Sequence, residues 1–299
     1  MTNESQTTVG IIGGTGLYEL ESFRDAQWVS VQSPFGEPSD DILIGTFEGI
    51  RVAFLPRHGR GHRIPADQVN YRANIDALKR VGVDRLLGFS AVGSLKEELA
   101  PGTLVLVDQY IDRTNNRVGT FFEHGFTVHV SMADPVCNTM CDAVQSAATD
   151  AGIDIVRGGT YLVMNGPQFS TRAESNLYRT WGCDVIGMTN MPEAKLAREA
   201  EIAYATVAMV TDYDCWHTQH EDVSAALVLE VLKQNSERAK QLVRAAIPAI
   251  GKLQAPFPSG VHRVLEHAIA TSPEHRDSEI VRKLSAVAGR VLENRGWSG

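Results

Sequence analysis

The sequence predicts an α/β fold, because short apolar runs that end in small or polar residues alternate with segments of helical spacing. Three such runs carry the prediction. Residues 86–94 form an apolar strand that ends in Ser-Ala-Val-Gly-Ser, residues 9–12 lead into Gly-Gly-Thr-Gly, and residues 202–210 lead into Thr-Asp-Tyr-Asp. Open α/β sheets bind ligands at the carboxyl ends of their strands. We therefore expect the chemistry of this chain at the ends of these three strands.

Length, charge and cysteine content narrow the class of protein. With 299 residues, 43% of them hydrophobic, the chain can fill one large α/β core or two smaller ones. A net charge of -8 without a Lys/Arg cluster argues against a nucleic-acid partner. The four cysteines have neither the density of a disulfide framework nor the spacing of a zinc site, so we expect thiols in a reducing cytosol.

The hydropathy pattern predicts a cytoplasmic protein that does not enter a membrane. Residues 1–8 have neither the basic start nor the apolar stretch of a secretory signal, and no run of about 18 apolar residues occurs. We expect residues 1–8 to be a short mobile leader.

A glycine-rich loop follows the first predicted strand. In Gly13-Gly14-Thr15-Gly16 the glycines let the backbone approach a ligand closely, and Thr15 offers a hydroxyl. This pattern is typical of a phosphate loop. The spacing does not fit the dinucleotide fingerprint GxGxxG, because Glu19 stands where the last glycine is required. An NAD-dependent enzyme is therefore disfavoured.

A basic loop follows the hairpin predicted for residues 42–47 and 52–55. Five of the seven residues from Arg57 onward are basic or titratable, in the order RHGRGHR. One interpretation is a solvated loop; the other is an anion clamp, in which the planar fork of Arg57 matches phosphate oxygens. A metal site is disfavoured because His58 and His62 have no third ligand nearby in the sequence.

The run at residues 86–94 also has two interpretations. It is either an ordinary buried strand and tight turn, or a strand end whose hydroxyls and backbone N–H groups hold an anion. A helix opened by Pro65 and ended by Gly82 should precede it, and a long irregular stretch at residues 112–134, which carries His124 and His129, should follow. Loops of that length inside a compact domain are usually functional.

The same rules place the remaining elements. We expect a strand at residues 103–107, a helix at 137–151, a strand at 158–164, a polar loop at 165–175 that opens a helix, a strand from 185 that ends in Gly and Thr before a helix begun by Pro192, and an amphipathic helix at 222–247.

Two carboxylates stand just beyond the strand predicted for residues 202–210. In a β conformation Asp212 and Asp214 would point to the same face, where a pair of acids is suited to acid chemistry. Alternatively, each is a turn or cap former, a frequent role of Asp at strand ends.

Nine stretches in this order carry a family resemblance: GIIGGTGL, SPFGEPSD, PRHGRGH, NYRANI, VGSLKEEL, DQYIDRT, GPQFSTRAES, GMTNMPEAKLAREA and TDYDCWH. Together they resemble the purine nucleoside phosphorylase family, in its S-methyl-5′-thioadenosine phosphorylase branch. The resemblance covers about residues 9–250. It implies a single phosphorylase domain over residues 1–299, with the core at 9–250, a mixed central β-sheet flanked by helices, and a C-terminal helical segment at 251–299.

The resemblance also implies phosphorolysis of a purine nucleoside at its N-glycosidic bond, in a homotrimer or a dimer of trimers. Inorganic phosphate is then a co-substrate, and neither a cofactor nor a metal is expected. The residues implied to bind phosphate are Thr15, Arg57, His58, Ser90, Ala91 and Thr189.

The resemblance implies a different role for each of the two carboxylates, Asp212 and Asp214. Asp212 matches the residue at purine N7, which delivers or shares a proton as the base departs, and Asp214 matches a residue near the exocyclic amine; Tyr213 belongs to the same substrate-binding set. Members that cleave 6-oxopurine nucleosides carry Glu in place of Ser170 and Asn in place of Asp212. Because adenine has no N1 proton for a Glu to accept, these differences favour an aminopurine.

The sugar pocket is implied by three further residues. Met188 would lie against the ribose, and His129 would reach the neighbouring subunit's 5′ pocket. Ala225 stands where a larger aliphatic such as Val is expected, which leaves the 5′-substituent preference open. Methylthioinosine, adenosine and inosine are therefore alternative substrates. From another class, a non-catalytic nucleoside-binding protein would bind without turnover.

The last stretch departs from the family pattern. The segment that starts at Ser272 and Pro273 predicts a helix with Ile280, Leu284, Val287 and Val291 on one face. We expect an appended surface helix beyond the usual terminus, in preference to an oligomer-forming or lid element.

Overall fold

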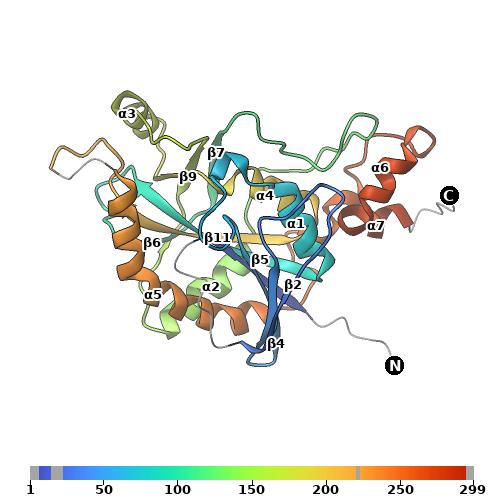
Figure 1. The fold of residues 1–299 in the computed structure, drawn as a ribbon, viewed down its shortest axis with the longest axis horizontal. Helices are drawn as coiled ribbons and strands as arrows, with labels where there is room; N and C mark the ends of the chain where they lie inside the picture. Colours follow the sequence, from blue (N-terminus) through green and yellow to red (C-terminus); the bar gives the residue numbers. More distant parts are fainter. Residues whose placement is uncertain (1–6, 15–22, 220–222, 294–299) are drawn as a thin grey trace.

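Eleven strands pair into one sheet in the computed structural model of the protein, which describes residues 7–14, 23–219 and 223–293 (Figure 1). The strands are β1 (Thr8–Gly13), β2 (Arg24–Val29), β3 (Ile42–Phe47), β4 (Ile50–Pro56), β5 (Val83–Ser94), β6 (Leu104–Leu106), β7 (Gln109–Arg113), β8 (Val156–Arg157), β9 (Thr160–Met164), β10 (Val185–Gly187) and β11 (Ala203–Asp212). Their order is β2-β3-β4-β1-β5-β10-β9-β7, while β11 pairs with β5 and β6, and β6 with β8. Both parallel and antiparallel pairs occur, which confirms a mixed sheet.

The helices cover both faces of this sheet (Figure 1). They are α1 (Tyr71–Arg80), α2 (Asn138–Asp150), α3 (Arg172–Thr180), α4 (Asn190–Glu199), α5 (Ala225–Gly251), α6 (Ser278–Lys283) and α7 (Ser285–Glu293), with 3-10 turns η1 (Ala66–Gln68), η2 (Val261–Glu266) and η3 (Pro273–His275). Successive strand residues enter opposite cores, because β side chains alternate. Ile12 belongs to the core that contains residues of α1, α4 and α7, whereas Ile11 belongs to the core that contains residues of α2 and α5. The predicted α/β fold is thus confirmed.

The central strands bring their carboxyl ends to one edge. β1 is parallel to β4 and β5, and β11 is parallel to β5. β1 and β11 are buried along their whole length, as expected of parallel strands covered on both faces. β10 runs antiparallel to β5, with Val185 opposite Ser94 and Ile186 opposite Gly93. The residues that follow β10 therefore return toward Ser90.

Two helices have bounds that differ from the sequence prediction. Pro65 does not open a regular helix, because the chain makes only the turn η1 before α1 begins, and Asn70 caps α1 by accepting from the N–H of Ala73 at 3.1 Å. The amphipathic helix α5 extends beyond residue 247 to Gly251, and its cap is Ser224, whose Oγ accepts from Leu227 at 3.2 Å.

The C-terminal segment is not an appended surface helix, so that prediction was wrong. It forms α6 and α7, and the side chains of Leu284 and Val287 are 0% and 2% exposed within the core that α1 and α4 share. Arg290 of α7 also donates to both oxygens of Glu201, at 2.6 and 2.8 Å. The segment therefore completes one of the two larger cores.

No helix within the described ranges is both long and apolar enough to cross a lipid bilayer. Cys137, Cys141, Cys183 and Cys215 are thiols outside any disulfide in this structure, and all four are buried.

Candidate active site

The site is built on the ends of the parallel strands. Arg57 directly follows β4, and its backbone N–H donates to the carbonyl of Gly13 at the end of β1, at 2.9 Å. Ser90 and Ala91 lie further along β5, opposite Ala208 and Met209 of β11. Thr15 lies outside the described residues, so its predicted place in the phosphate site stays a prediction.

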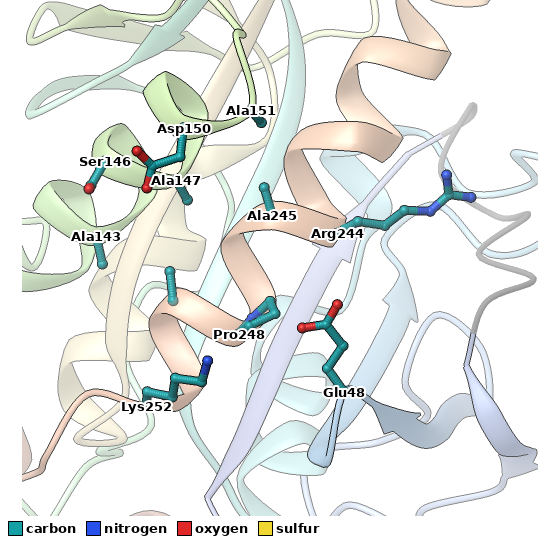
Figure 2. A pocket seen from close by; sticks show the side chains of 11 residues that line it. Glu48, Ala143, Ser146, Ala147, Asp150, Ala151, Arg244, Ala245, Pro248 and Lys252 are labelled. Carbon is teal, nitrogen blue, oxygen red and sulfur yellow. The ribbon is translucent and has the colours of Figure 1, made fainter.

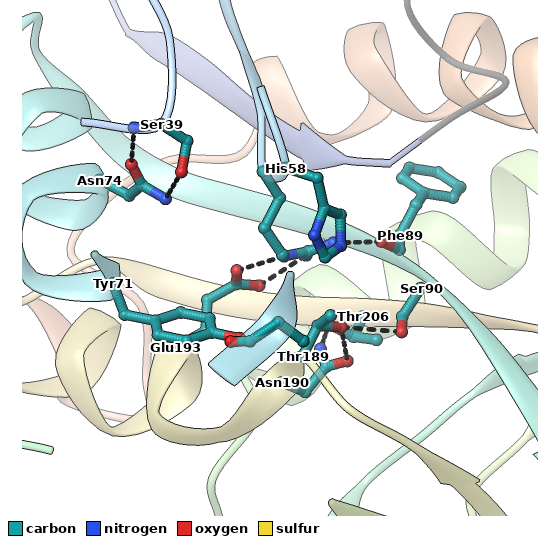
Figure 3. Close-up of polar contacts among 12 residues, drawn as sticks. Ser39, His58, Tyr71, Asn74, Phe89, Ser90, Thr189, Asn190, Glu193 and Thr206 are labelled. Atoms are coloured by element: carbon teal, nitrogen blue, oxygen red, sulfur yellow. Dashed lines mark hydrogen bonds and ion pairs between the residues drawn. The ribbon is translucent and has the colours of Figure 1, made fainter. Parts of the chain in front are cut away.

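The guanidinium of Arg57 is held by a buried carboxylate. Nε donates to Oε2 of Glu193 at 2.6 Å, Nη2 donates to Oε1 at 2.8 Å, and Nη1 donates to the carbonyl of Phe89 at 2.8 Å (Figure 3). Burial acts to lower the pKa of Arg57, but the Glu193 carboxylate outweighs it and holds the pKa above its ordinary value. Three of the five guanidinium N–H groups thus have partners in the described part of the chain, and the cation is fixed in place.

Glu193 is itself fixed by a buried polar network. Its Oε1 accepts from the hydroxyl of Tyr204 at 2.7 Å, and Asn190 donates to the same hydroxyl at 2.5 Å. Asn190 also donates to Thr206 at 2.6 Å (Figure 3). Gly88 of β5 makes room for this network, because a Cβ there would stand 2.7 Å from Oγ1 of Thr206. The sequence did not single out Glu193, which lies on a helix 136 residues after Arg57.

His58 presents one ring nitrogen to the site in a fixed tautomer. Its Nδ1 lies 2.8 Å from the carbonyl of Ile64 and must donate to it, which leaves Nε2 as an acceptor. Burial and the charge of Arg57 lower the pKa of His58 to about 4. The ring is therefore neutral at pH 7, and it stacks on His62 with 4.3 Å between ring centroids.

Ser90 and Thr189 meet where β10 returns along β5. Their hydroxyls lie 2.9 Å apart (Figure 3), and the Ser90 hydroxyl also lies 2.9 Å from that of Tyr161. Thr189 occupies the N-cap position of α4 without a side-chain cap bond. Hydroxyls beside a helix N-terminus and a fixed guanidinium form a setting suited to an anion.

The two carboxylates are close together, but not through strand alternation. β11 ends at Asp212, and Asp214 has a left-handed backbone (φ 52°), so that its N–H donates to Oδ1 of Asp212 at 2.7 Å. Thr211 donates to Oδ2 at 2.7 Å. Burial raises the pKa of Asp212 to about 6, and burial also raises that of Asp214. The expectation that a β conformation aligns the pair was wrong, because the chain turns after Asp212.

The other predicted substrate residues differ in their placement. The carbonyl of Ser170 accepts from Sγ of Cys215 at 3.3 Å, which places the polar loop beside the carboxylates. Met188 packs against Gly166 of the same loop, where a Cβ would stand 2.5 Å from its Sδ. The hydroxyl of Tyr213, by contrast, donates to the carbonyl of Glu97 at 3.1 Å, away from its two acidic neighbours.

His129 and Ala225 are not brought to this group within the described part of the protein. His129 is exposed on the irregular segment after β7, and its backbone N–H donates to the carbonyl of Ala268 at 2.9 Å. Ala225 is exposed as the first residue of α5.

A separate hollow of about 600 Å³ lies between α2, α5 and the turn of the β3–β4 hairpin (Figure 2). None of the predicted site residues lines it. Its lining residues are Glu48, Ala143, Ser146, Ala147, Asp150, Ala151, Arg244, Ala245, Pro248, Ala249 and Lys252. Across residues 7–14, 23–219 and 223–293, no group of three or more His, Cys, Asp or Glu side chains is placed to hold a metal ion.

A family model described as "Phosphorylase superfamily" matches residues 8–248. The chain belongs to the phosphorylase superfamily. Its relatives in this superfamily include an S-methyl-5′-thioadenosine phosphorylase of Rhodospirillum rubrum, 58% identical over 96% of this chain and 98% of the relative, and one of Cereibacter sphaeroides, 54% identical over 96% and 99%. Similarity at this level places the chain in the S-methyl-5′-thioadenosine phosphorylase branch.

Solved phosphorylase structures agree with the fold. A methylthioadenosine phosphorylase from an antarctic soil metagenomic library is 46% identical, with a TM-score of 0.88 over 94% of this chain and 99% of that one. The enzyme of Schistosoma mansoni in complex with adenine is 36% identical, with a TM-score of 0.79 over 83% and 93%.

The relatives also correct the view that residues 272–299 extend beyond the usual terminus. The Rhodospirillum rubrum phosphorylase aligns over 287 residues, more than the 271 that precede Ser272. Part of the C-terminal segment is therefore shared with this relative.

Proposed function

We propose that this member of the phosphorylase superfamily cleaves S-methyl-5′-thioadenosine with inorganic phosphate, which releases adenine and 5-methylthioribose 1-phosphate. The observation that carries the proposal is that the guanidinium of Arg57 and the buried carboxyl of Asp212 lie at two points along the same strand, β5. Arg57 donates to the carbonyl of Phe89 on β5, Thr189 contacts Ser90 of the same strand, and Asp212 lies opposite Gly93 three residues further on. Three residues of strand span about 10 Å, which suits a ribosyl group between a phosphate and a purine.

The anion end is suited to hydrogen phosphate. The two N–H groups of Arg57 that Glu193 and Phe89 do not use are available to phosphate oxygens as a charge-assisted pair. Neutral His58 accepts at Nε2, and is therefore matched to the P–OH of the dianion. Ser90, Ala91, Thr189 and Thr15 complete the proposed phosphate site.

In the proposed reaction, the C1′–N9 bond breaks as the ribosyl group becomes oxocarbenium-like, and a phosphate oxygen forms the new bond to C1′. The departing purine takes a proton at N7 from Asp212, whose raised pKa suits it to hold that proton near neutrality. Asp214, which orients Asp212 through its backbone N–H, is assigned to the exocyclic amine. No cofactor or metal is needed for this balance.

The proposal extends to substrate choice and assembly. Ser170 and Asp212 favour adenine over a 6-oxopurine, Met188 lies against the ribose, and Ala225 tunes the 5′ pocket. His129 is exposed on this chain and is assigned to the 5′ pocket of a neighbouring copy, in a homotrimer or a dimer of trimers. Residues 1–299 act as one phosphorylase domain in the cytoplasm, in purine and methionine salvage.

One assay tests the function: adenine release from S-methyl-5′-thioadenosine with and without phosphate. We expect release only with phosphate, together with a sugar 1-phosphate. Equal turnover without phosphate would mean a hydrolase, and binding without turnover would mean a nucleoside-binding protein. Relative rates on methylthioinosine, adenosine and inosine separate the neighbouring activities. Light scattering tests the assembly, and a fully active monomer would rule out the role of His129.

A further inference from the structure

Arg117 lies in the irregular segment after β7 and reaches two other segments of the site. Its Nη1 donates to the carbonyls of Met188 and Met191, each at 2.7 Å, and to the hydroxyl of Tyr71 at 3.1 Å. Its Nη2 donates to the carbonyl of Asn165. One partly exposed guanidinium thus gathers backbone carbonyls from two segments that are more than twenty residues apart in the sequence.

The two segments carry the predicted sugar and phosphate contacts. Met188 and Met191 flank Thr189, whose hydroxyl contacts Ser90, and Asn190, which belongs to the network around Glu193. Asn165 begins the loop that leads to Ser170. The segments also touch directly, since Gly166 leaves no room for a Cβ beside Sδ of Met188.

The bonding requires an arginine. Met191 departs from helical geometry at the start of α4 (φ −120°, ψ 131°), and its carbonyl accepts from Arg117. A planar guanidinium presents donors in several fixed directions, whereas a lysine ammonium is a compact charge on a flexible stem. A lysine at this position keeps the charge but loses the simultaneous hold on the three carbonyls.

We propose that Arg117 is a positioning residue for phosphorolysis, which holds the segment of Met188 and Thr189 against the loop of Asn165 so that sugar and phosphate contacts keep their relative positions. This inference rests on the proposed function. Arg117 acts through the backbone of these segments and is not assigned a contact with substrate. A displacement of about 1 Å between reacting groups can lower a rate by about 100-fold.

Arg117 also affects the pKa of His58, and this effect depends on its charge and not on its hydrogen bonds. Burial and the charge of Arg57 dominate the low pKa of His58, and His62 and Arg117 lower it further. Removal of the Arg117 charge should therefore raise the pKa of His58. Replacement by lysine should leave that pKa nearly unchanged.

The test compares Arg117→Met and Arg117→Lys with Arg72→Met as a matched control. Arg72 ties α1 to the segment of Arg117 through Glu123, at 2.9 Å, and contacts neither Asn165 nor Met188. We expect both Arg117 variants to lose about 10- to 100-fold in kcat/KM, with KM raised for phosphate and for nucleoside. Arg72→Met should stay within about twofold of the parent. Histidine NMR should show a raised His58 pKa only in Arg117→Met.

Binding of phosphate and of adenine, measured by calorimetry, tests Arg117 independently of turnover. If the parent releases no adenine with phosphate, the proposed function fails, and weaker binding of both ligands in the two Arg117 variants would still support the positioning role. Folded Arg117 variants that keep kcat, both KM values and both affinities within about twofold of the parent would overturn it, even if their Tm falls. Full recovery of activity in Arg117→Lys would also overturn it, because charge alone would then suffice.

Discussion

Glu193 accepts two hydrogen bonds from the side chain of Arg57, at 2.6 and 2.8 Å, and the side chains are 0% and 1% exposed. Removal of one partner from a buried pair of this kind typically costs about 3–5 kcal/mol, because the other charge stays buried without compensation. The Arg57 guanidinium is therefore oriented before an anion arrives, and binding of phosphate does not have to order it.

Replacement of Arg57 by alanine should weaken phosphate binding more than nucleoside binding. The variant loses a charge-assisted fork at the anion end only, and also leaves Glu193 unpaired, so its stability should fall as well. KM values for both substrates and denaturant unfolding measure the two effects. Arg60→Ala is the control, because Arg60 is on the same loop but its side chain is 47% exposed and pairs with Asp40. An equal rise in both KM values for Arg57→Ala would contradict the assignment.

Asp212→Asn keeps the size of the side chain but removes the proton that N7 requires. Adenine release should fall by about 10² to 10⁴, the usual contribution of general acid catalysis. Activity on methylthioinosine should fall much less, because an amide both donates and accepts near a 6-oxopurine. The measurement is the ratio of kcat/KM for the two substrates. If the ratio and the adenine rate stay within about twofold of the parent, the acid is Asp214.

The pH profile should report the same carboxyl. Burial raises the pKa of Asp212 from 3.8 to about 6, so the acid form is lost as pH rises through this value. The kcat/KM for nucleoside should fall on the alkaline side, and this limb should be absent in Asp212→Asn. His58 stays neutral over this range because its pKa is about 4. A limb that persists in Asp212→Asn would point to another group.

The same shift links Asp212 to stability. Because the folded pKa lies above the unfolded value, the folded state binds more protons between pH 3.8 and about 6. The contribution of Asp212 to stability is therefore fully present at lower pH and is lost as pH rises through about 6. Between pH 4 and 8, denaturant unfolding should show a smaller loss of stability with rising pH in Asp212→Asn than in the parent, because Glu199 and Asp214, whose pKa values burial also raises, remain in the variant.

Leu284→Ala tests whether α6 and α7 complete the core. Leu284 is 0% exposed and packs in the core that includes α1 and α4, so truncation should cost about 2–5 kcal/mol. Ser285→Ala, at an exposed neighbouring position, should change stability by no more than about 0.5 kcal/mol. Urea unfolding compares the two. Equal stability of both variants would mean that the segment of α6 and α7 does not contribute to the core.

The sequence predicted the strand ends well, because β1 and β11 are buried on both faces and are continuous apolar runs that stop at polar residues. Arg57 and Asp212 stood out as candidates because each follows such a strand, although a solvated loop and a turn or cap role were left open for them. Glu193 and Arg117 were not, because their partners come from distant segments that only the crossing of strands and helices brings together. The sequence left the turn at Asp214 open as an alternative to a continued strand, because a strand pattern does not report where φ becomes positive. The sequence showed the buried face of α7 as an apolar stripe, but it did not show that this face packs in the core that includes α1.

The four buried cysteines can serve as native probes of local unfolding. Cys137 and Cys141 lie in the core shared by α2 and α5, Cys183 lies in a smaller cluster with Leu95, and Cys215 lies beside Asp214. A thiol reagent reaches each sulfur only when its surroundings open, and different parts of a protein open with different free energies. The labelling rate of each cysteine therefore measures the opening of its own part of the molecule without an introduced probe, and protection of Cys215 by a ligand would mark occupation of the carboxylate end of the site.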